Sequence, residues 1–191
     1  YSNGILHLTT RQALQLHYVQ LNHTPKLWAE LEKDAITLRE ACGNTVRNVT
    51  ASVFTGVNPN EAFDATPVGL TFFDYFLRNP LWQDLGRKFK VAFSCSPADY
   101  AMTFVHDLGF IPVLDKGRKG FRVVLGGGIG SQPMPAIKIY DFLPVEKIIP
   151  FSEAVLRVFE RYGERNKRNK ARLKFLIQQI GIDTFLAHVR E

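Results

Sequence analysis

Residues 110–125 read FIPVLDKGRKGFRVVL, and this stretch decides the fold. Two apolar runs, Phe110–Asp115 and Phe121–Leu125, are separated by the glycine-containing segment KGRKG. Apolar runs rich in valine and other strand formers on either side of such a turn are typical of a β-hairpin. We therefore expect two adjacent strands of a buried sheet here.

The chain on both sides of this hairpin alternates between strands and helices. Residues 87–94 (RKFKVAFS) alternate at first and then become continuously apolar, as a central strand does. The other expected elements are a strand from residue 7, a short strand within 43–60, helices at 24–38, 68–77 and 98–108, and helices from residue 143 onward. This order predicts an α+β fold with a mixed β-sheet and flanking helices.

The opening stretch, residues 7–19 (HLTTRQALQLHYV), alternates in a way that is typical of an edge strand. One side of such a strand would carry mostly leucines. The other side would carry a polar row that contains His7, Thr9, Arg11, Gln15 and His17. Taken alone, the stretch predicts an edge strand whose polar face is solvated.

Composition indicates a basic globular chain with one core. The 191 residues are 46% hydrophobic, and the net charge of +6 favours anionic partners. No apolar run is long enough for a membrane span. Cys42 and Cys95 are too few for a disulfide framework or a cysteine-ligated cluster, which predicts a cytoplasmic protein. Because the sequence begins at Tyr1, inside an expected element, we expect a piece of a longer protein.

Two motifs have residue types that occur in ligand sites. Residues 126–130 (GGGIG) follow a strand, but QPMP at 132–135 prevents the helix that a dinucleotide-binding loop needs. We expect instead a turn that lets the backbone approach a neighbouring segment or a flat ligand. The five histidines show no zinc-ligand spacing, so no metal site is expected among them.

Basic residues gather in two places. Residues 161–174 (RYGERNKRNKARLK) favour a solvated amphipathic helix, with a nucleic-acid footprint or a docking face for an acidic electron donor as alternatives. Separately, Lys88 and Lys90 face one side of their strand, while Arg47 lies in a loop and Arg11 on the polar row. If these four converge, they form a cationic cavity that requires an anion. The alternative is that each pairs with its own surface carboxylate.

Five separated blocks then carry a family resemblance: LTTRQALQLH, ACGNTVRNVTA, RKFKVAFS, GFRVVLGGGIG and YGERNKRNKARLKFLI. In this order and spacing they resemble the nitrite/sulfite reductase hemoproteins, which carry a sirohaem coupled to a [4Fe-4S] cluster. The resemblance implies that residues 1–38 are the C-terminal part of a ferredoxin-like half-domain. It implies that residues 39–191 are the first of two sirohaem/cluster domains.

The resemblance also assigns residues. Thr9, Arg11, Gln15 and His17 fall where the family contacts sirohaem and its carboxylates. Another set, Arg47, Lys88 and Lys90, matches the basic residues that hold the substrate oxyanion. The family's cluster cysteines, in the patterns Cys-x5-Cys and Cys-x3-Cys, do not occur here, so this chain supplies no metal ligands and the missing C-terminal half is expected to supply them.

The implied activity is the six-electron reduction of sulfite to sulfide, or of nitrite to ammonia, in the intact protein. The electron donor would be a ferredoxin or a flavoprotein subunit, and the isolated piece is expected to be inactive, with or without bound cofactor. Two other hypotheses stay open: a basic oxyanion- or nucleic-acid-binding module without redox activity, and a structural half that never binds sirohaem. Nucleic acid is the less favoured partner, and no membrane association is expected.

Overall fold

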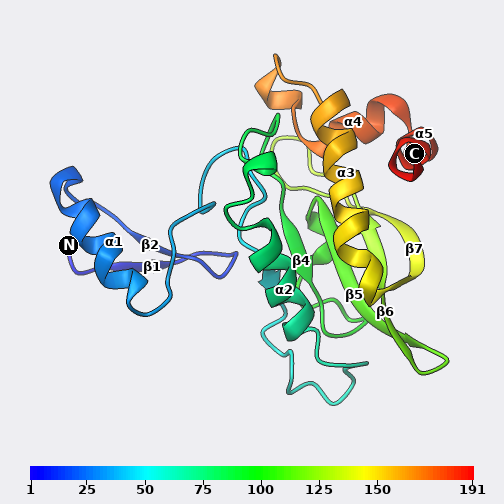
Figure 1. Cartoon of the computed structure of the whole chain (residues 1–191), viewed down its shortest axis with the longest axis horizontal. Coiled ribbons are helices and arrows are strands. Elements are labelled where there is room, and N and C mark those ends of the chain that lie inside the picture. The colour runs from blue at the N-terminus through cyan, green and yellow to red at the C-terminus, as the bar shows by residue number, and fades with distance from the viewer.

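The computed structural model describes residues 1–191 and has a five-stranded sheet at its centre (Figure 1). In spatial order the strands are β3 (Thr50–Ala51), β4 (Val91–Phe93), β5 (Leu108–Asp115), β6 (Arg118–Leu125) and β7 (Ile137–Pro144). The first three strands pair in parallel, and β5, β6 and β7 form an antiparallel meander. The expected α+β fold with a mixed sheet is confirmed, and so is the hairpin of residues 110–125.

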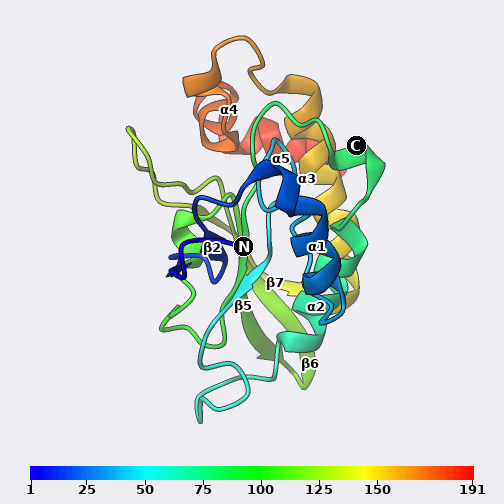
Figure 2. The ribbon, with the colours of Figure 1, turned by 90° about the vertical axis from the view of Figure 1, so that its left-hand side faces the viewer.

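Helices cover one face of this sheet. Helices α2 (Thr66–Phe76) and α3 (Ile148–Tyr162) lie on the same side, as the two views show together (Figures 1 and 2). Helices α4 (Leu173–Ile180) and α5 (Ile182–Arg190) contact each other and α3. Short 3-10 turns lie at Leu21–His23, Pro80–Trp82, Thr103–Val105, Val145–Lys147 and Arg168–Lys170. None of the helices is both long and apolar enough to span a membrane.

The centre of the core is a group of four phenylalanines. Phe72 of α2 meets Phe93 of β4 and Phe110 of β5 edge-on, Phe121 of β6 belongs to the same cluster, and each of the four is at most 1% exposed. The Phe93 and Phe110 rings stack with centroids 4.9 Å apart, and Phe121 meets both edge-on. Such aromatic packing buries a large apolar area and adds a preferred geometry. It fixes α2 against the middle of the sheet.

The N-terminal residues form a separate small unit. Strands β1 (Leu6–Leu8) and β2 (Leu14–Leu16) pair as an antiparallel hairpin, followed by α1 (Thr24–Glu32). The unit lies at one end of the molecule and reaches the sheet through the tip of the hairpin (Figure 1). The expected single strand from residue 7 is therefore wrong. The chain reverses at residues 9–13, where Gln12 has a φ of 60°.

Four other expected elements differ from the structure. The strand expected at residues 87–94 covers only Val91–Phe93, so Lys88 and Lys90 lie before it rather than within it. The helix from residue 24 ends at Glu32 rather than at residue 38, and Ala35 has a φ of 57°, in the left-handed region. The helix expected at 98–108 is wrong, because Asp99 and Met102 have φ values of 52° and 53° that no right-handed helix continues through. Strand β7 was not predicted, and the helix expected from residue 143 begins at Ile148.

Candidate functional site

A cleft of about 410 Å³ lies where the tip of the N-terminal hairpin meets the sheet. Its walls come from the hairpin turn, the short strand β3, the residue before β4 and the segment that leads into β5. The lining residues are Thr9, Thr10, Arg11, Gln12, Thr50, Ala51, Val53, Lys90, Tyr100, Ala101, Met102, Val105, His106 and Ile129. The cleft therefore combines two cations with several apolar side chains.

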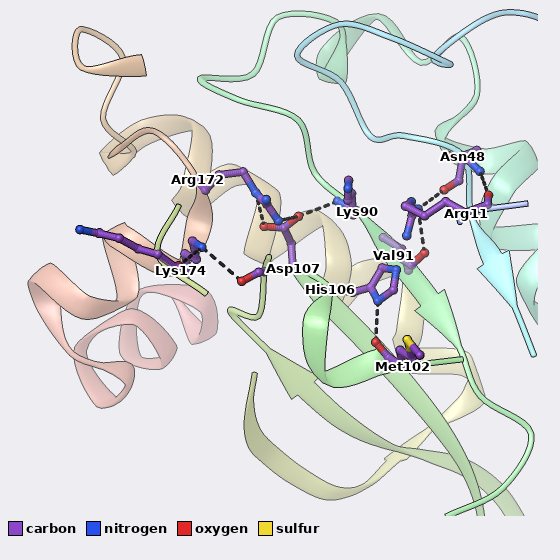
Figure 3. A network of polar contacts seen from close by, with 11 residues as sticks. Arg11, Asn48, Lys90, Val91, Met102, His106, Asp107, Arg172 and Lys174 are labelled. Carbon is purple, nitrogen blue, oxygen red and sulfur yellow. Dashed lines mark hydrogen bonds and ion pairs between the residues drawn. The ribbon is translucent and has the colours of Figure 1, made fainter. Parts of the chain in front are cut away.

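The hairpin turn is tied to the sheet by its own polar groups. Arg11 Nη2 donates to the Asn48 carbonyl oxygen at 2.7 Å and to the Val91 carbonyl oxygen at 3.5 Å, and Asn48 Nδ2 donates to the Arg11 carbonyl oxygen at 2.8 Å (Figure 3). Gln12 Nε2 donates to the Ala51 carbonyl oxygen at 2.6 Å. Side chains and backbone thus close the cleft on the side of the hairpin.

One nitrogen of Arg11 remains without a partner. The Nη1 atom is buried and forms no hydrogen bond with the protein. Burial, with Arg47 and Arg172 nearby, lowers the pKa of Arg11 to about 10, although Asp107 opposes the shift. The guanidinium stays charged at neutral pH, and a buried charged donor without an acceptor is costly. The geometry fits an anionic group in the cleft.

Lys90 is the second cation of the cleft. It is half-buried, and its ammonium forms no ion pair with a carboxylate. Burial, together with the charges of Arg11, Lys88 and Arg172, lowers the pKa of Lys90 to about 8, although Asp107 opposes the shift. A lysine with this pKa is mostly charged at pH 7 and can give up its proton readily.

Of the four cations singled out in the sequence, Arg11 and Lys90 line the cleft and Arg47 and Lys88 do not. Arg47 acts electrostatically on Arg11 and Lys88, and Arg11 and Lys88 act on Lys90. Burial is the first cause that lowers the pKa of Lys88, and Arg47 adds to it. None of Arg11, Arg47, Lys88 and Lys90 pairs with a carboxylate, which argues against the alternative of four separate surface pairs. Arg47 donates from Nε and Nη1 to the carbonyl oxygens of Gly43 and Ala41.

The residues expected to contact sirohaem are only partly brought together. Thr9 and Arg11 line the cleft. Gln15 lies on β2 and His17 directly follows that strand, and both are exposed and outside the lining. The His17 ring instead lies 5.6 Å, between centroids, from the ring of His7 on the paired strand. Their expected contacts with the cofactor stay predictions.

The most deeply buried polar group of this region was not predicted from the sequence. Asp107 accepts two hydrogen bonds from Arg172, from Nε at 3.0 Å and from Nη2 at 2.8 Å, and one from the backbone N–H of Lys90 at 2.8 Å (Figure 3). Lys174 donates to the carbonyl oxygens of Gly128 and Gln132. The expected solvated helix at 161–174 is therefore wrong. Residues 163–172 form no α-helix, and both Arg172 and Lys174 are buried.

His106 is a further lining residue that the sequence did not single out. Its Nδ1 lies 2.8 Å from the Met102 carbonyl oxygen. Burial and the positive charge of Arg11 lower the pKa of His106 to about 4, so the ring is neutral at pH 7. A neutral ring that donates from Nδ1 presents its other nitrogen as an acceptor. The sequence gives one indication of its role: His106 and Asp107 are two adjacent polar residues that directly precede an apolar strand.

The glycines at 126–128 allow the close approach expected of them. A Cβ on Gly127 would lie 2.4 Å from the Phe104 carbonyl oxygen and 2.6 Å from that of His106. A Cβ on Gly128 would lie 2.9 Å from Arg172 Nη2. The glycine loop therefore packs directly behind the cleft, against the segment that carries His106.

Replacing Gly127 with alanine is expected to destabilise the fold by about 1–3 kcal/mol, because backbone must move to make room. Gly69 in α2 is the matched control, since its Cβ would meet only Phe93 at 3.7 Å. Gly69→Ala is expected to stabilise by about 0.5–1 kcal/mol through helix propensity. Denaturant unfolding measures the free energy of unfolding of both variants. Equal values would contradict the close packing of Gly127 against the segment that carries His106.

No three side chains of His, Cys, Asp or Glu lie close enough together to hold a metal ion. Cys42 is exposed, and Cys95 is buried with its Sγ 3.2 Å from Ser52 Oγ and 3.4 Å from Asn58 Nδ2.

Comparison with known proteins connects this chain to a family. A profile described as the nitrite and sulphite reductase 4Fe-4S domain matches residues 42–191, and one described as the nitrite/sulfite reductase ferredoxin-like half domain matches residues 1–34. The chain belongs to the nitrite and sulfite reductase family. The resemblance carried by the five sequence blocks is thereby confirmed.

Individual members of the nitrite and sulfite reductase family show the same relationship. Sulfite reductase [ferredoxin] 1 of Mycolicibacterium paratuberculosis is 33% identical over 93% of this chain and 32% of its own length. Ferredoxin–nitrite reductase of Synechococcus elongatus is 33% identical over 96% of this chain and 37% of its own length. The solved structure of the Mycobacterium tuberculosis NirA protein superposes with a TM-score of 0.89 at 32% identity, covering 97% of this chain and 34% of that one. The chain spans about a third of the length of these relatives.

Proposed function

We propose that the chain is part of a reductase that converts sulfite to sulfide, or nitrite to ammonia, at a sirohaem coupled to a [4Fe-4S] cluster. The observation that carries the proposal is the unpartnered, buried Nη1 of Arg11 in a cleft that also holds the unpaired ammonium of Lys90. Relatives named as sulfite reductase and as nitrite reductase are equally similar, so the proposal covers both anions. A ferredoxin or a flavoprotein subunit would supply electrons.

The residues of the cleft fit a flat macrocycle that carries carboxylates. Apolar side chains such as Val53, Val105 and Ile129 suit the ring system, and Arg11 offers a fixed, charged donor to a carboxylate. Sirohaem, when bound, supplies the iron at which the anion is reduced. The cluster ligands belong, in this proposal, to a second half of the protein. We propose that the boundary between the ferredoxin-like unit and the sirohaem/cluster domain lies between residues 38 and 39.

The cations of this chain would bind and protonate the anion. A unit cation about 4 Å from an oxyanion contributes roughly 4 kcal/mol at an effective dielectric of 20. Arg47 stays charged and would orient the anion, while Lys88 and Lys90 would donate protons as oxygen leaves as water. The lowered pKa of Lys90, about 8, favours this proton transfer at neutral pH. An anion beside the ammonium raises that pKa again, so the lysine recovers its proton between steps.

Lys90→Met in the whole reductase is expected to raise the KM for sulfite or nitrite about tenfold, because one charge-assisted contact with the anion is lost. Lys138→Met is the matched control, since Lys138 is an exposed cation of β7. Steady-state kinetics with both anions, on protein with an unchanged sirohaem spectrum, measure the effect. A Lys90→Met enzyme with unchanged kinetics would remove Lys90 from the proposal.

A further inference from the structure

Asp107 occupies a special position among the cations of the cleft. It is 0% exposed and is the only carboxylate whose charge acts on Lys90, Arg11 and Arg172 together. One oxygen, Oδ2, accepts from both Arg172 Nη2 and the Lys90 backbone N–H, each at 2.8 Å (Figure 3). The other, Oδ1, accepts from Arg172 Nε at 3.0 Å. The carboxylate therefore joins three segments: the entry to β4, the entry to β5 and the entry to α4.

This geometry has two separate consequences for Lys90. The hydrogen bond to its backbone N–H fixes the residue at the point where the chain enters β4, just before the parallel ladder with β5 begins at Val91 and Leu108. The two-pronged pair with Arg172 places a negative charge between that guanidinium and the lysine. Without it, a buried arginine charge would act on the ammonium unopposed.

We propose that Asp107 is a positioning residue for Lys90: it holds the lysine backbone at the cleft and pairs with Arg172, and so keeps the Lys90 ammonium charged at neutral pH. The inference deepens the proposed function, because it concerns the lysine assigned there to bind the anion and to donate a proton. Asp107 itself is fully buried and is not among the residues that line the cleft.

The charged groups that face Lys90 come from every element around it. Arg11 acts from the hairpin turn, Lys88 from the same segment and Arg172 from the start of α4, and all three lower the pKa of Lys90. Asp107 alone raises it. His106 also lines the cleft but is neutral at pH 7. Removing the carboxylate must therefore lower the pKa of Lys90, and removing the Arg172 guanidinium must raise it.

The test is to titrate Lys90 directly in the 191-residue chain. Competitive acetylation of lysines at a series of pH values, read by mass spectrometry, gives a midpoint for each amine. Asp107→Asn is expected to shift the Lys90 midpoint below about 8, and Arg172→Gln is expected to shift it above that value. Asp107→Glu keeps the negative charge, so its Lys90 midpoint should stay close to that of the unchanged chain. Asp141→Asn, an exposed carboxylate on β7, is the matched control and should leave the midpoint unchanged.

The opposite signs separate electrostatic control from simple damage to the fold, because a loosened structure would move both midpoints the same way. Circular dichroism shows which variants fold. If Asp107→Asn does not fold, the comparison of the Lys90 midpoints of Arg172→Gln and Asp107→Glu decides, because only Arg172→Gln should raise the midpoint. An unmoved Lys90 midpoint in folded variants would overturn the inference. In the whole reductase, Asp107→Asn should also move the alkaline limit of turnover to lower pH. If the midpoint moves and that limit does not, the proton-donor role of Lys90 fails while the inference about Asp107 stands.

Discussion

Replacing Arg11 with glutamine is expected to weaken sirohaem binding to the reductase about a hundredfold, or about 3 kcal/mol, the upper range for a hydrogen bond to a charged group. The guanidinium offers the one buried donor in the cleft that lacks a partner. It also ties the hairpin turn to Asn48 and Val91, so glutamine would lose both the proposed ion pair with the cofactor and part of the cleft wall. Titration of the apo-protein with sirohaem, followed by absorbance, measures the effect.

Arg118→Gln is the matched control, because Arg118 is an exposed arginine of β6 that pairs only with Glu146. Its sirohaem affinity should equal that of the unchanged protein. Arg11→Gln protein that is folded and binds sirohaem with unchanged affinity would show that the cleft does not hold the cofactor through this residue.

The largest loss of stability is expected from Phe110→Ala, which should lower the free energy of unfolding by about 4 kcal/mol. The Phe110 ring is fully buried and contacts three other phenylalanine rings: it stacks on Phe93 and meets Phe72 and Phe121 edge-on. Truncation leaves a cavity between α2 and the middle of the sheet, which surrounding side chains fill only in part. Urea unfolding followed by circular dichroism measures the change.

Phe54→Ala serves as the control for this truncation, because Phe54 is 45% exposed in a loop and contacts one other ring, that of Tyr100. Its cost should stay below about 1 kcal/mol, since little apolar area is lost from the core. A Phe110→Ala variant no less stable than Phe54→Ala would mean that the four-phenylalanine group does not organise the core.

The parts of the fold that the sequence predicts are those that local patterns determine. The hairpin at 110–125 has two apolar strands around a turn at Lys116 and Gly117, so neighbouring residues contain all the information needed. Helix α2 begins next to Pro67 and is apolar on its buried face, and it was predicted within two residues. In such elements the local pattern and the tertiary contacts agree.

The parts that were missed depend on contacts between distant residues or on unusual backbone. The turn at 9–13 contains no glycine, and Gln12 adopts its positive φ while its side chain is held by Ala51. Strand β7 is only half-buried at the edge of the sheet, so its alternation is weak. A basic run ordinarily indicates a solvated surface, and nothing local shows that Arg172 is paired with Asp107, 65 residues away.

The candidate site was likewise predictable from the sequence only in part. Arg11 and Lys90 line the cleft, while Arg47 acts on Arg11 and Lys88 acts on Lys90 from outside the lining. Convergence of these four cations was one of two alternatives in the sequence, and the anion-binding role that the resemblance gives to Arg47, Lys88 and Lys90 stays a prediction. The sequence could not show that Asp107 lies behind them. A single aspartate before an apolar strand is common, and its burial depends on where three separate segments meet.

The placement of Arg11 also bears on the order in which the protein folds. Strands β5, β6 and β7 follow one another along the chain, so their meander closes only short loops and should form early. The contacts of Arg11 with Asn48 and Val91 join residues 37 and 80 positions apart, and β3 pairs with β4 across a similar separation. Such distant pairings cost more chain entropy and form later. The cleft is therefore completed in the last stage of folding, so an intermediate that already contains most of the sheet still lacks the site proposed for the cofactor.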